Sequence, residues 1–118
     1  MEKKPPFLII AGPCVIESKE MLFEVAAELK RICSNFNIEY IFKSSYKKAN
    51  RTSANSFTGI GDDIALNYLA EVKEKFNVRV LTDIHSVEEA QIASQYVDIL
   101  QIPAFLCRQT ELLVAAAK

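Results

Sequence analysis

The chain has 118 residues, of which 50% are hydrophobic and 25% charged, and its formal net charge is −1. This length allows one domain with a modest core, and the near-neutral charge argues against a nucleic-acid partner, whose phosphates require a positive field. No apolar run approaches the roughly 18 residues of a membrane span, and three cysteines without an export signal predict reduced thiols and a cytoplasmic protein with no membrane partner.

Strands and helices are expected to alternate along the first part of the chain. An apolar run over residues 7–11 predicts a strand buried on both faces. From residue 19 to 36, apolar residues recur at helical spacing, with Ser18 as the N-cap. Cys33 lies on the apolar face of this helix, which places it in the core. Residues 38–42 form the second predicted strand.

The second half of the chain repeats this alternation. Asp62 or Asp63 can cap a second helix, and Ser86 with Glu89 three residues later is a capping box that opens a third. The remaining strands and the last helical stretch are residues 78–81, 97–102 and 111–118. The resulting order, β-α-β-α-β-α-β-α, predicts a parallel sheet with right-handed crossovers.

This order is compatible with two α/β folds. One is a compact, open, four-stranded sheet. The other is a (βα)8 TIM barrel, which needs about 250 residues, so that four βα units are half of it. The helical pattern continues to the last residue without a stop signal. We therefore favour residues 1–118 as the N-terminal half of a single (βα)8 barrel catalytic domain.

The chemically unusual residues all follow predicted strands. They form four clusters, at residues 12–18, 43–53, 83–85 and 101–108. Because the carboxyl ends of parallel strands meet at one end of a sheet, and ligands bind there, these clusters are expected to lie together. The opposite loops, residues 34–37 and 76–77, carry no comparable chemistry. This asymmetry predicts a functional site at the carboxyl end.

The most polar cluster is the basic segment, residues 43–53, which reads Lys-Ser-Ser-Tyr-Lys-Lys-Ala-Asn-Arg-Thr-Ser. Its lysines are point charges, Arg51 offers a forked guanidinium, and its hydroxyls and amide are neutral donors. Such a set can hold a small, highly phosphorylated ligand. A solvated basic loop has a similar composition, but the position of this segment after a buried strand favours a site.

Other candidate residues each allow two interpretations. Cys14 is either a small core residue or a thiolate that binds metal or attacks a substrate. Asp83 and His85, which is the only histidine in the sequence, are two positions apart, so on an extended chain their side chains point to the same side. They either form local hydrogen bonds at the strand end or take part in the site. Arg108 is either a surface cation or a residue that reaches an anion across a subunit contact.

Several of these stretches together resemble the 3-deoxy-D-manno-octulosonate 8-phosphate synthases, and the likeness extends over about residues 7–118. The matching segments are 10–18 (IAGPCVIES), 42–45 (FKSS), 48–53 (KANRTS), 81–85 (LTDIH) and 101–110 (QIPAFLCRQT). The resemblance implies a (βα)8 barrel about twice this length that assembles as a homotetramer. It also implies a metal-dependent condensation of phosphoenolpyruvate with arabinose 5-phosphate, an early step toward the inner sugar of lipopolysaccharide.

The resemblance further implies roles for individual residues. Those that bind phosphoenolpyruvate would be Lys43, Ser45, Lys48, Gln101 and the backbone of Ala104. Those that bind the pentose phosphate would be Asn50, Arg51 and Thr52, with Lys48 and Asn50 the catalytic pair. Arg108, with Phe105 beside it, would reach into a neighbouring subunit's site. Cys14 would bind a divalent metal ion. The other metal ligands (a histidine, a glutamate and an aspartate), and a further Lys and Arg for phosphoenolpyruvate, are expected beyond Lys118.

Two departures and two alternatives accompany this resemblance. Thr52 replaces a common serine, and Lys47 stands where an acidic residue is frequent, which makes the loop more basic. A related synthase that uses erythrose 4-phosphate has a motif similar to Lys-Pro-Arg-Thr-Ser, whereas Asn50 adds an amide suited to a five-carbon sugar. The other alternative is a non-catalytic, phosphate-binding half-barrel. The 118 residues alone are expected to be inactive.

Overall fold

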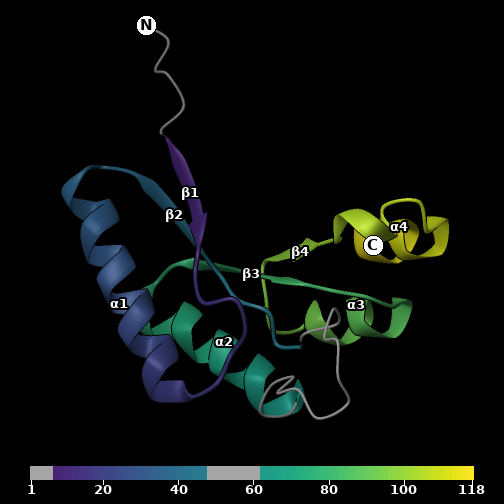
Figure 1. Cartoon of the computed structure of the whole chain (residues 1–118), viewed down its shortest axis with the longest axis horizontal. Coiled ribbons are helices and arrows are strands. Elements are labelled where there is room, and N and C mark those ends of the chain that lie inside the picture. The colour runs from purple at the N-terminus through teal and green to yellow at the C-terminus, as the bar shows by residue number, and fades with distance from the viewer. Residues whose placement is uncertain (1–6, 48–61) are drawn as a thin grey trace, which may run out of the picture.

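The computed structural model describes residues 7–47 and 62–118, which form one parallel sheet with intervening helices (Figure 1). The strands are β1 (Leu8–Ala11), β2 (Glu39–Lys43), β3 (Arg79–Asp83) and β4 (Ile99–Gln101). The helices are α1 (Lys19–Asn35), α2 (Asp62–Phe76), α3 (Val87–Ala93) and α4 (Thr110–Ala117), with a 3-10 turn η1 (Ala104–Leu106) before α4. The predicted alternation of strands and helices is confirmed.

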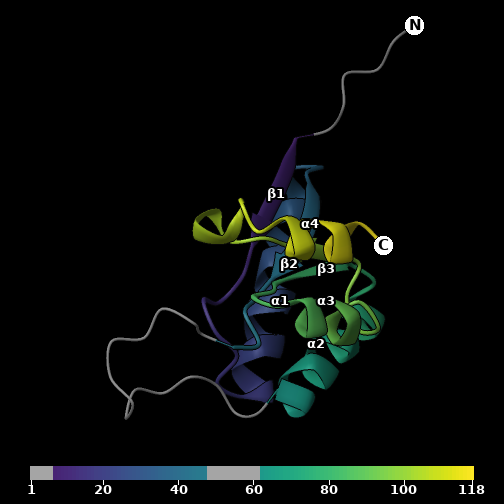
Figure 2. The ribbon, with the colours of Figure 1, turned by 90° about the vertical axis from the view of Figure 1, so that its right-hand side faces the viewer.

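The order of strands in the sheet identifies the fold class. The strands lie in the order β1-β2-β3-β4, and each pairs in parallel with the next one along the chain. A doubly wound sheet reverses its strand order at a switch point, which these four strands do not. Helices that follow one another along the chain pack together in pairs, α1 with α2 and α3 with α4 (Figures 1 and 2). This is the arrangement of the first four βα units of a (βα)8 barrel.

The core lies between the sheet and the first two helices. Side chains from both helices and from the central strands are fully buried, including Leu22, Leu69, Phe42 and Val80. Cys33 is only 2% exposed and belongs to this core, as the sequence predicts. Each large apolar side chain buried in this way stabilises the fold by about 1.5–3 kcal/mol.

Two expectations about burial are wrong. The first strand is not buried on both faces, because within residues 7–47 and 62–118 β1 pairs only with β2 and is an edge strand, and Leu8 and Ile10 are 43% and 47% exposed. Phe36 is 71% exposed instead of facing the core, because it is the C-cap of α1 with φ −107° and no longer follows the helical rotation.

The predicted N-cap residues are only partly confirmed. The Ser18 side chain accepts a hydrogen bond from the Met21 amide at 3.1 Å, which confirms the predicted N-cap. Asp62 and Asp63 instead lie in the first turn of α2, where the helix dipole favours negative charge. In the described part of the chain, no helix is long and apolar enough to cross a membrane.

Candidate active site

The loop after β1 is held tightly against the end of β2. The Ile16 amide donates to the Ser45 carbonyl at 3.1 Å, and the Ser45 amide donates to the Cys14 carbonyl at 3.3 Å. A Cβ atom at Gly12 would lie 1.8 Å from the Lys43 carbonyl oxygen, so only glycine allows this approach. The loop that carries Cys14 is therefore fixed beside the segment that carries Lys43 and Ser45.

Buried hydroxyl groups connect three of the strand ends. Ser44 Oγ donates to the Pro13 carbonyl at 2.7 Å, and Thr82 Oγ1 donates to the Ser44 carbonyl at 2.8 Å. Both side chains are almost fully buried, with exposures of 1% and 0%. Because a buried carbonyl that loses its donor is costly, these bonds hold the ends of β1, β2 and β3 in one arrangement.

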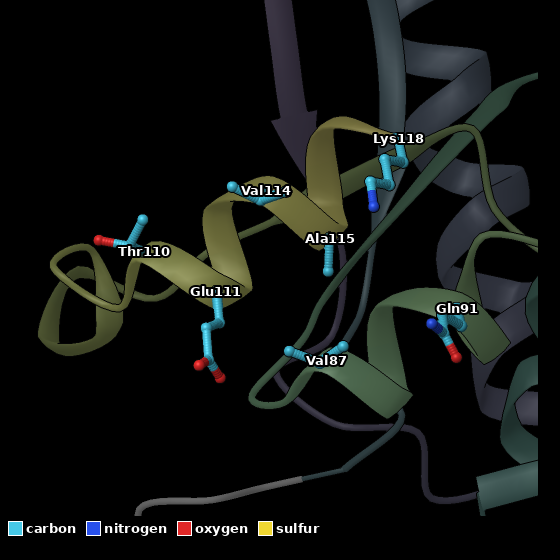
Figure 3. A pocket seen from close by; sticks show the side chains of 7 residues that line it. All are labelled: Val87, Gln91, Thr110, Glu111, Val114, Ala115 and Lys118. Atoms are coloured by element: carbon cyan, nitrogen blue, oxygen red, sulfur yellow. The ribbon is translucent and has the colours of Figure 1, made fainter.

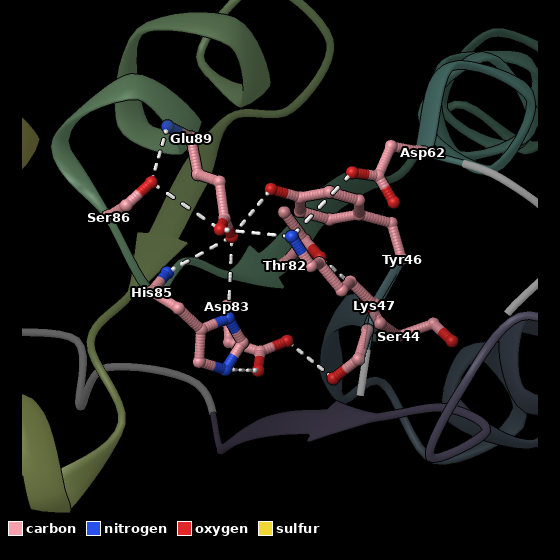
Figure 4. Close-up of polar contacts among 10 residues, drawn as sticks. Ser44, Tyr46, Lys47, Asp62, Thr82, Asp83, His85, Ser86 and Glu89 are labelled. Atoms are coloured by element: carbon pink, nitrogen blue, oxygen red, sulfur yellow. Dashed lines mark hydrogen bonds and ion pairs between the residues drawn. The ribbon is translucent and has the colours of Figure 1, made fainter. Parts of the chain in front are cut away.

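A chain of polar side chains lies at this end of the sheet (Figure 4). Ser45 Oγ donates to Asp83 Oδ1, and the other carboxylate oxygen of Asp83 lies 3.4 Å from His85 Nε2. The second ring nitrogen of His85, Nδ1, lies 3.4 Å from Glu89 Oε1. The Asp83 and His85 side chains are each 13% exposed, so both are largely removed from solvent. Asp83 and His85 thus point toward each other, and neither is a simple surface residue.

Glu89 joins this chain to the start of the basic segment. Its Oε1 accepts a hydrogen bond from the Tyr46 hydroxyl at 2.9 Å, and its Oε2 lies 3.5 Å from Lys47 Nζ. Burial tends to raise the pKa of Glu89. Its pKa nevertheless lies below the ordinary value, because three other effects are larger together: the hydrogen bond from Tyr46, the positive charge of Lys47 and the contacts with His85. Burial and the bond to Glu89 raise the pKa of Tyr46, which remains a phenol.

The end of β4 contributes residues to the same region. Gln101 ends this strand, and its carbonyl accepts a bond from the Ile84 amide at 3.0 Å. Phe105, in η1 with Ala104, is 70% exposed, and its ring centroid lies 6.4 Å from that of His85. Arg108 follows η1 and is exposed. The structure thus brings Gln101 and Phe105 to the end of the sheet that carries Lys43 and Ser45.

The structure describes only some of the residues to which the resemblance assigns a role. Lys48, Asn50, Arg51 and Thr52 lie outside the described residues, so their roles stay predictions. The roles predicted for the described residues in substrate binding are likewise untested.

The predicted metal site is not complete in the described chain. Cys14 is exposed and lies at the carboxyl end of the sheet. Within residues 7–47 and 62–118, no group of three or more His, Cys, Asp and Glu gathers to hold a metal ion. One thiolate does not fit a catalytic metal, which takes about three protein ligands. Metal binding by Cys14 therefore requires ligands from elsewhere and stays a prediction.

The sequence presents Ser44 as a ligand donor of the basic segment and Glu89 as part of a capping box. It does not reveal that Ser44, Tyr46 and Thr82 are buried beneath this region, or that the largely buried Glu89 carboxylate joins it. The Glu89 amide does donate to Ser86 Oγ at 3.2 Å, but the Glu89 carboxylate reaches the amide of His85 at 3.2 Å. The capping pattern was the only local signal, because the contact with Tyr46 spans 43 positions of the chain.

Two pockets near α3 differ in their relation to this region. One, of about 420 Å³, lies between α3 and α4 and is lined by Val87, Gln91, Thr110, Glu111, Val114, Ala115 and Lys118 (Figure 3). The other, also about 420 Å³, is bordered by His85, Ser86, Leu106 and Gln109, among others. Only the second borders the polar chain, and neither pocket is lined by Lys43, Ser45 or Gln101.

Comparison with known proteins establishes the family. The sequence profile described as the DAHP synthetase I family matches residues 2–118. The match covers nearly the whole chain, and the fold and the polar carboxyl end of the sheet agree with it. The chain belongs to the DAHP synthetase I family.

The curated relatives carry a more specific name, 2-dehydro-3-deoxyphosphooctonate aldolase, a synonym for the synthases that the motifs resemble. One from Campylobacter jejuni is 59% identical over 111 residues, which are 94% of this chain and 41% of the relative. One from Fusobacterium nucleatum is 53% identical over 98% of this chain and 41% of its own length. One from Burkholderia multivorans is 51% identical over 96% of this chain and 40% of its own length. The chain therefore spans about two fifths of the length of these relatives.

Proposed function

We propose that residues 1–118 are the N-terminal half of a cytoplasmic 3-deoxy-D-manno-octulosonate 8-phosphate synthase. The reaction condenses phosphoenolpyruvate with D-arabinose 5-phosphate and releases phosphate, for lipopolysaccharide biosynthesis. The observation that carries this proposal is the 59% identity, over 94% of the chain, to a relative with the corresponding aldolase name. The polar residues at the carboxyl end of the sheet support it, since barrel enzymes place their active sites there.

The described residues suit the first step of this reaction, which is to hold two anionic substrates close together. Lys43 ends β2 beside Ser45, and the basic segment continues from there. In a partly desolvated site, charge-assisted hydrogen bonds to phosphate and carboxylate oxygens are stronger than in water. In this proposal, Lys43, Ser45 and Lys48 hold phosphoenolpyruvate with Gln101 and the Ala104 backbone.

The sugar phosphate would be bound by the rest of the basic segment. Arg51 suits the phosphate because its guanidinium fork matches two phosphate oxygens, while Asn50 and Thr52 can bind hydroxyls. Phe105 and Arg108, both exposed, would meet the sugar phosphate in a neighbouring subunit of a homotetramer. Cys14 would supply one ligand to a divalent metal ion that orients the aldehyde, the other ligands coming from outside the described residues.

A second candidate is the condensation of phosphoenolpyruvate with erythrose 4-phosphate. The description of the matched family, DAHP synthetase I, is the observation that supports this second reaction. The relatives named above are instead octonate aldolases, and the segment Lys48-Ala-Asn-Arg-Thr-Ser53 contains an amide that suits a longer sugar. The five-carbon substrate is therefore the better supported one.

The test uses a chimeric enzyme, in which residues 1–118 replace the matched part of the Campylobacter jejuni relative. We expect it to release phosphate from phosphoenolpyruvate with arabinose 5-phosphate and much more slowly with erythrose 4-phosphate. Arg51→Ala should raise the KM for the sugar phosphate, whereas residues 1–118 alone should be inactive. An assembled chimeric enzyme that uses only erythrose 4-phosphate, or neither sugar, would contradict the proposal.

A further inference from the structure

Glu89 is the most highly connected side chain of the described polar region. Its carboxylate contacts the Tyr46 hydroxyl, the Lys47 ammonium group, and both the amide and the ring of His85. The Glu89 side chain is 14% exposed, and Tyr46 is 2% exposed. With the Ser86 hydroxyl, which lies 3.4 Å from Glu89 Oε2, five groups therefore meet one largely buried carboxylate (Figure 4).

Helix capping accounts for only part of this arrangement. A capping box needs the Glu89 amide to bond Ser86 Oγ and the carboxylate to bond an amide before the helix. It does not need the hydroxyl of a buried tyrosine 43 positions away, or a histidine ring. Burying a carboxylate costs free energy unless its oxygens are paired, and here Tyr46, Lys47 and His85 pair them.

The contacts of Glu89 continue toward the predicted substrate residues. His85 lies between two carboxylates, with Nδ1 3.4 Å from Glu89 and Nε2 3.4 Å from Asp83. Asp83 in turn accepts the hydroxyl of Ser45, which lies two residues after Lys43. A change at Glu89 can therefore reorient the His85 ring, and with it the Asp83 carboxylate and the Ser45 hydroxyl.

We propose that Glu89 is a positioning residue for the condensation: it fixes the His85 ring against Asp83 and holds Lys47 at the start of the basic segment. This proposal rests on the proposed function. Glu89 touches no substrate in this scheme and acts only through its neighbours. Because a displacement of about 1 Å in a reacting group can cost a hundredfold in rate, loss of this support reduces turnover more than it reduces stability.

Glu89→Gln in the chimeric enzyme tests the proposal. The amide keeps the size of the side chain and can still cap α3, but its NH₂ group would face the Lys47 ammonium, donor against donor. We expect kcat to fall by about tenfold, with little change in the KM for either substrate and a melting temperature within a few degrees of the parent.

The matched control is Glu88→Gln, in the same first turn of α3. Glu88 is exposed, so its replacement removes the same charge from the helix N-terminus without touching the polar chain. We expect its kcat to stay within about twofold of the parent, because a helix-dipole contribution at an exposed site is small. Lys47→Gln removes the ion pair with Glu89 and also the longer contact with Asp62 at 3.9 Å, and it should lower kcat as Glu89→Gln does.

The spectroscopic readout is the ¹⁵N shift of the His85 ring, assigned by its loss in His85→Gln. It should change in Glu89→Gln and stay constant in Glu88→Gln. Unchanged kcat in Glu89→Gln would overturn the role of Glu89. The role of Glu89 would also be overturned if activity fell only in proportion to the amount of folded protein while the His85 ¹⁵N shifts stayed like those of the parent. If the folded parent chimera itself does not condense the two substrates, the proposed function fails and the role of Glu89 in it fails with it.

Discussion

The two ends of the parallel sheet use polar side chains in different ways. At the carboxyl end, hydroxyls and carboxylates from different βα units are largely buried and bond one another, as in the Tyr46 bond to Glu89, or bond backbone carbonyls, as in the Thr82 bond to Ser44. At the amino end, Arg79 pairs with Glu39 across two strands, and their side chains are 52% and 43% exposed. The first arrangement fixes side chains in one orientation, whereas the second leaves them in contact with solvent.

The turns at the amino end also differ in what they require of the backbone. Asn37 and Asn77 have φ values of 54° and 52°, in the left-handed region that asparagine tolerates. At the carboxyl end, Gly12 is required for the close approach of the Lys43 carbonyl. At the amino end, the left-handed residues lie in short turns that connect a helix to the next strand. At the carboxyl end, Gly12 allows two loops to contact each other. This difference agrees with a site at the carboxyl end.

The largest expected effect is that of Gly12→Ala. A Cβ atom there would lie 1.8 Å from a carbonyl oxygen and 2.8 Å from the carbonyl carbon of Lys43, so backbone must move. We expect the chimeric enzyme to lose about 3 kcal/mol or more of unfolding free energy, measured by urea denaturation. At the amino end, Asn77→Ala should cost only about 1 kcal/mol, the price of a left-handed alanine. Equal losses for the two variants would mean that the loop after β1 is not held as described.

Thr82→Val should have the next largest effect. Valine has the same shape but leaves the buried Ser44 carbonyl without the donor at 2.8 Å. The expected loss of unfolding free energy is about 1–3 kcal/mol. Thr110→Val, at an exposed position on α4, is the matched control and should change stability by about 0.5 kcal/mol or less. If Thr82→Val is as mild as the control, the carboxyl end is less rigid than the comparison suggests.

The third expected effect is on the unfolding free energy at acid pH. It involves one carboxylate at each end of the sheet, Glu89 at the carboxyl end and Asp98 at the amino end. The pKa of Glu89 lies below its ordinary value of 4.5, despite burial, because of Tyr46, Lys47 and His85. The pKa of Asp98 lies below its ordinary value of 3.8, again despite burial, because of Lys73 and the Val80 amide. In both cases the unfolded chain binds protons first, so this stabilisation is complete above the ordinary value and is lost as pH falls through the lower folded value.

Glu89→Gln should therefore flatten the decline of unfolding free energy below about pH 4.5, and Asp98→Asn should flatten it below about pH 3.8, both measured by urea denaturation at several pH values. Only Glu89→Gln should also lower kcat at neutral pH. A loss of kcat in Asp98→Asn similar to that in Glu89→Gln would remove the functional distinction between the two ends.

The smallest expected effect is that of the exposed pair Arg79–Glu39. A double-mutant cycle with Arg79→Gln and Glu39→Gln should give a coupling energy of about 0.2–1 kcal/mol, since solvent screens exposed charges. The coupling should shrink further in 1 M salt, where the Debye length is about 3 Å. A larger, salt-insensitive coupling would show that the amino end is also built from rigid polar contacts.

Much of the fold could be predicted from the sequence because its signals are local. Alternating apolar runs and helical repeats gave the order of elements, and the serines before α1 and α3 cap those helices as predicted. The position of the polar clusters after strands was enough to place Ser45, Asp83 and Gln101 at one end of the sheet. The exposure of β1 could not be predicted in this way, because an apolar run does not reveal whether a strand has one neighbour or two.

The sequence by itself therefore determined the alternation of elements, the core position of Cys33, the family and the end of the sheet that carries the chemistry. The tertiary structure decided which loops meet there: Cys14 beside Ser45, Gly12 against Lys43, and Glu89 between Tyr46 and His85. The physical reason is that periodicity reports the environment of a residue along its own helix or strand. Contacts between loops depend instead on strand order and register, which arise only when distant segments pair.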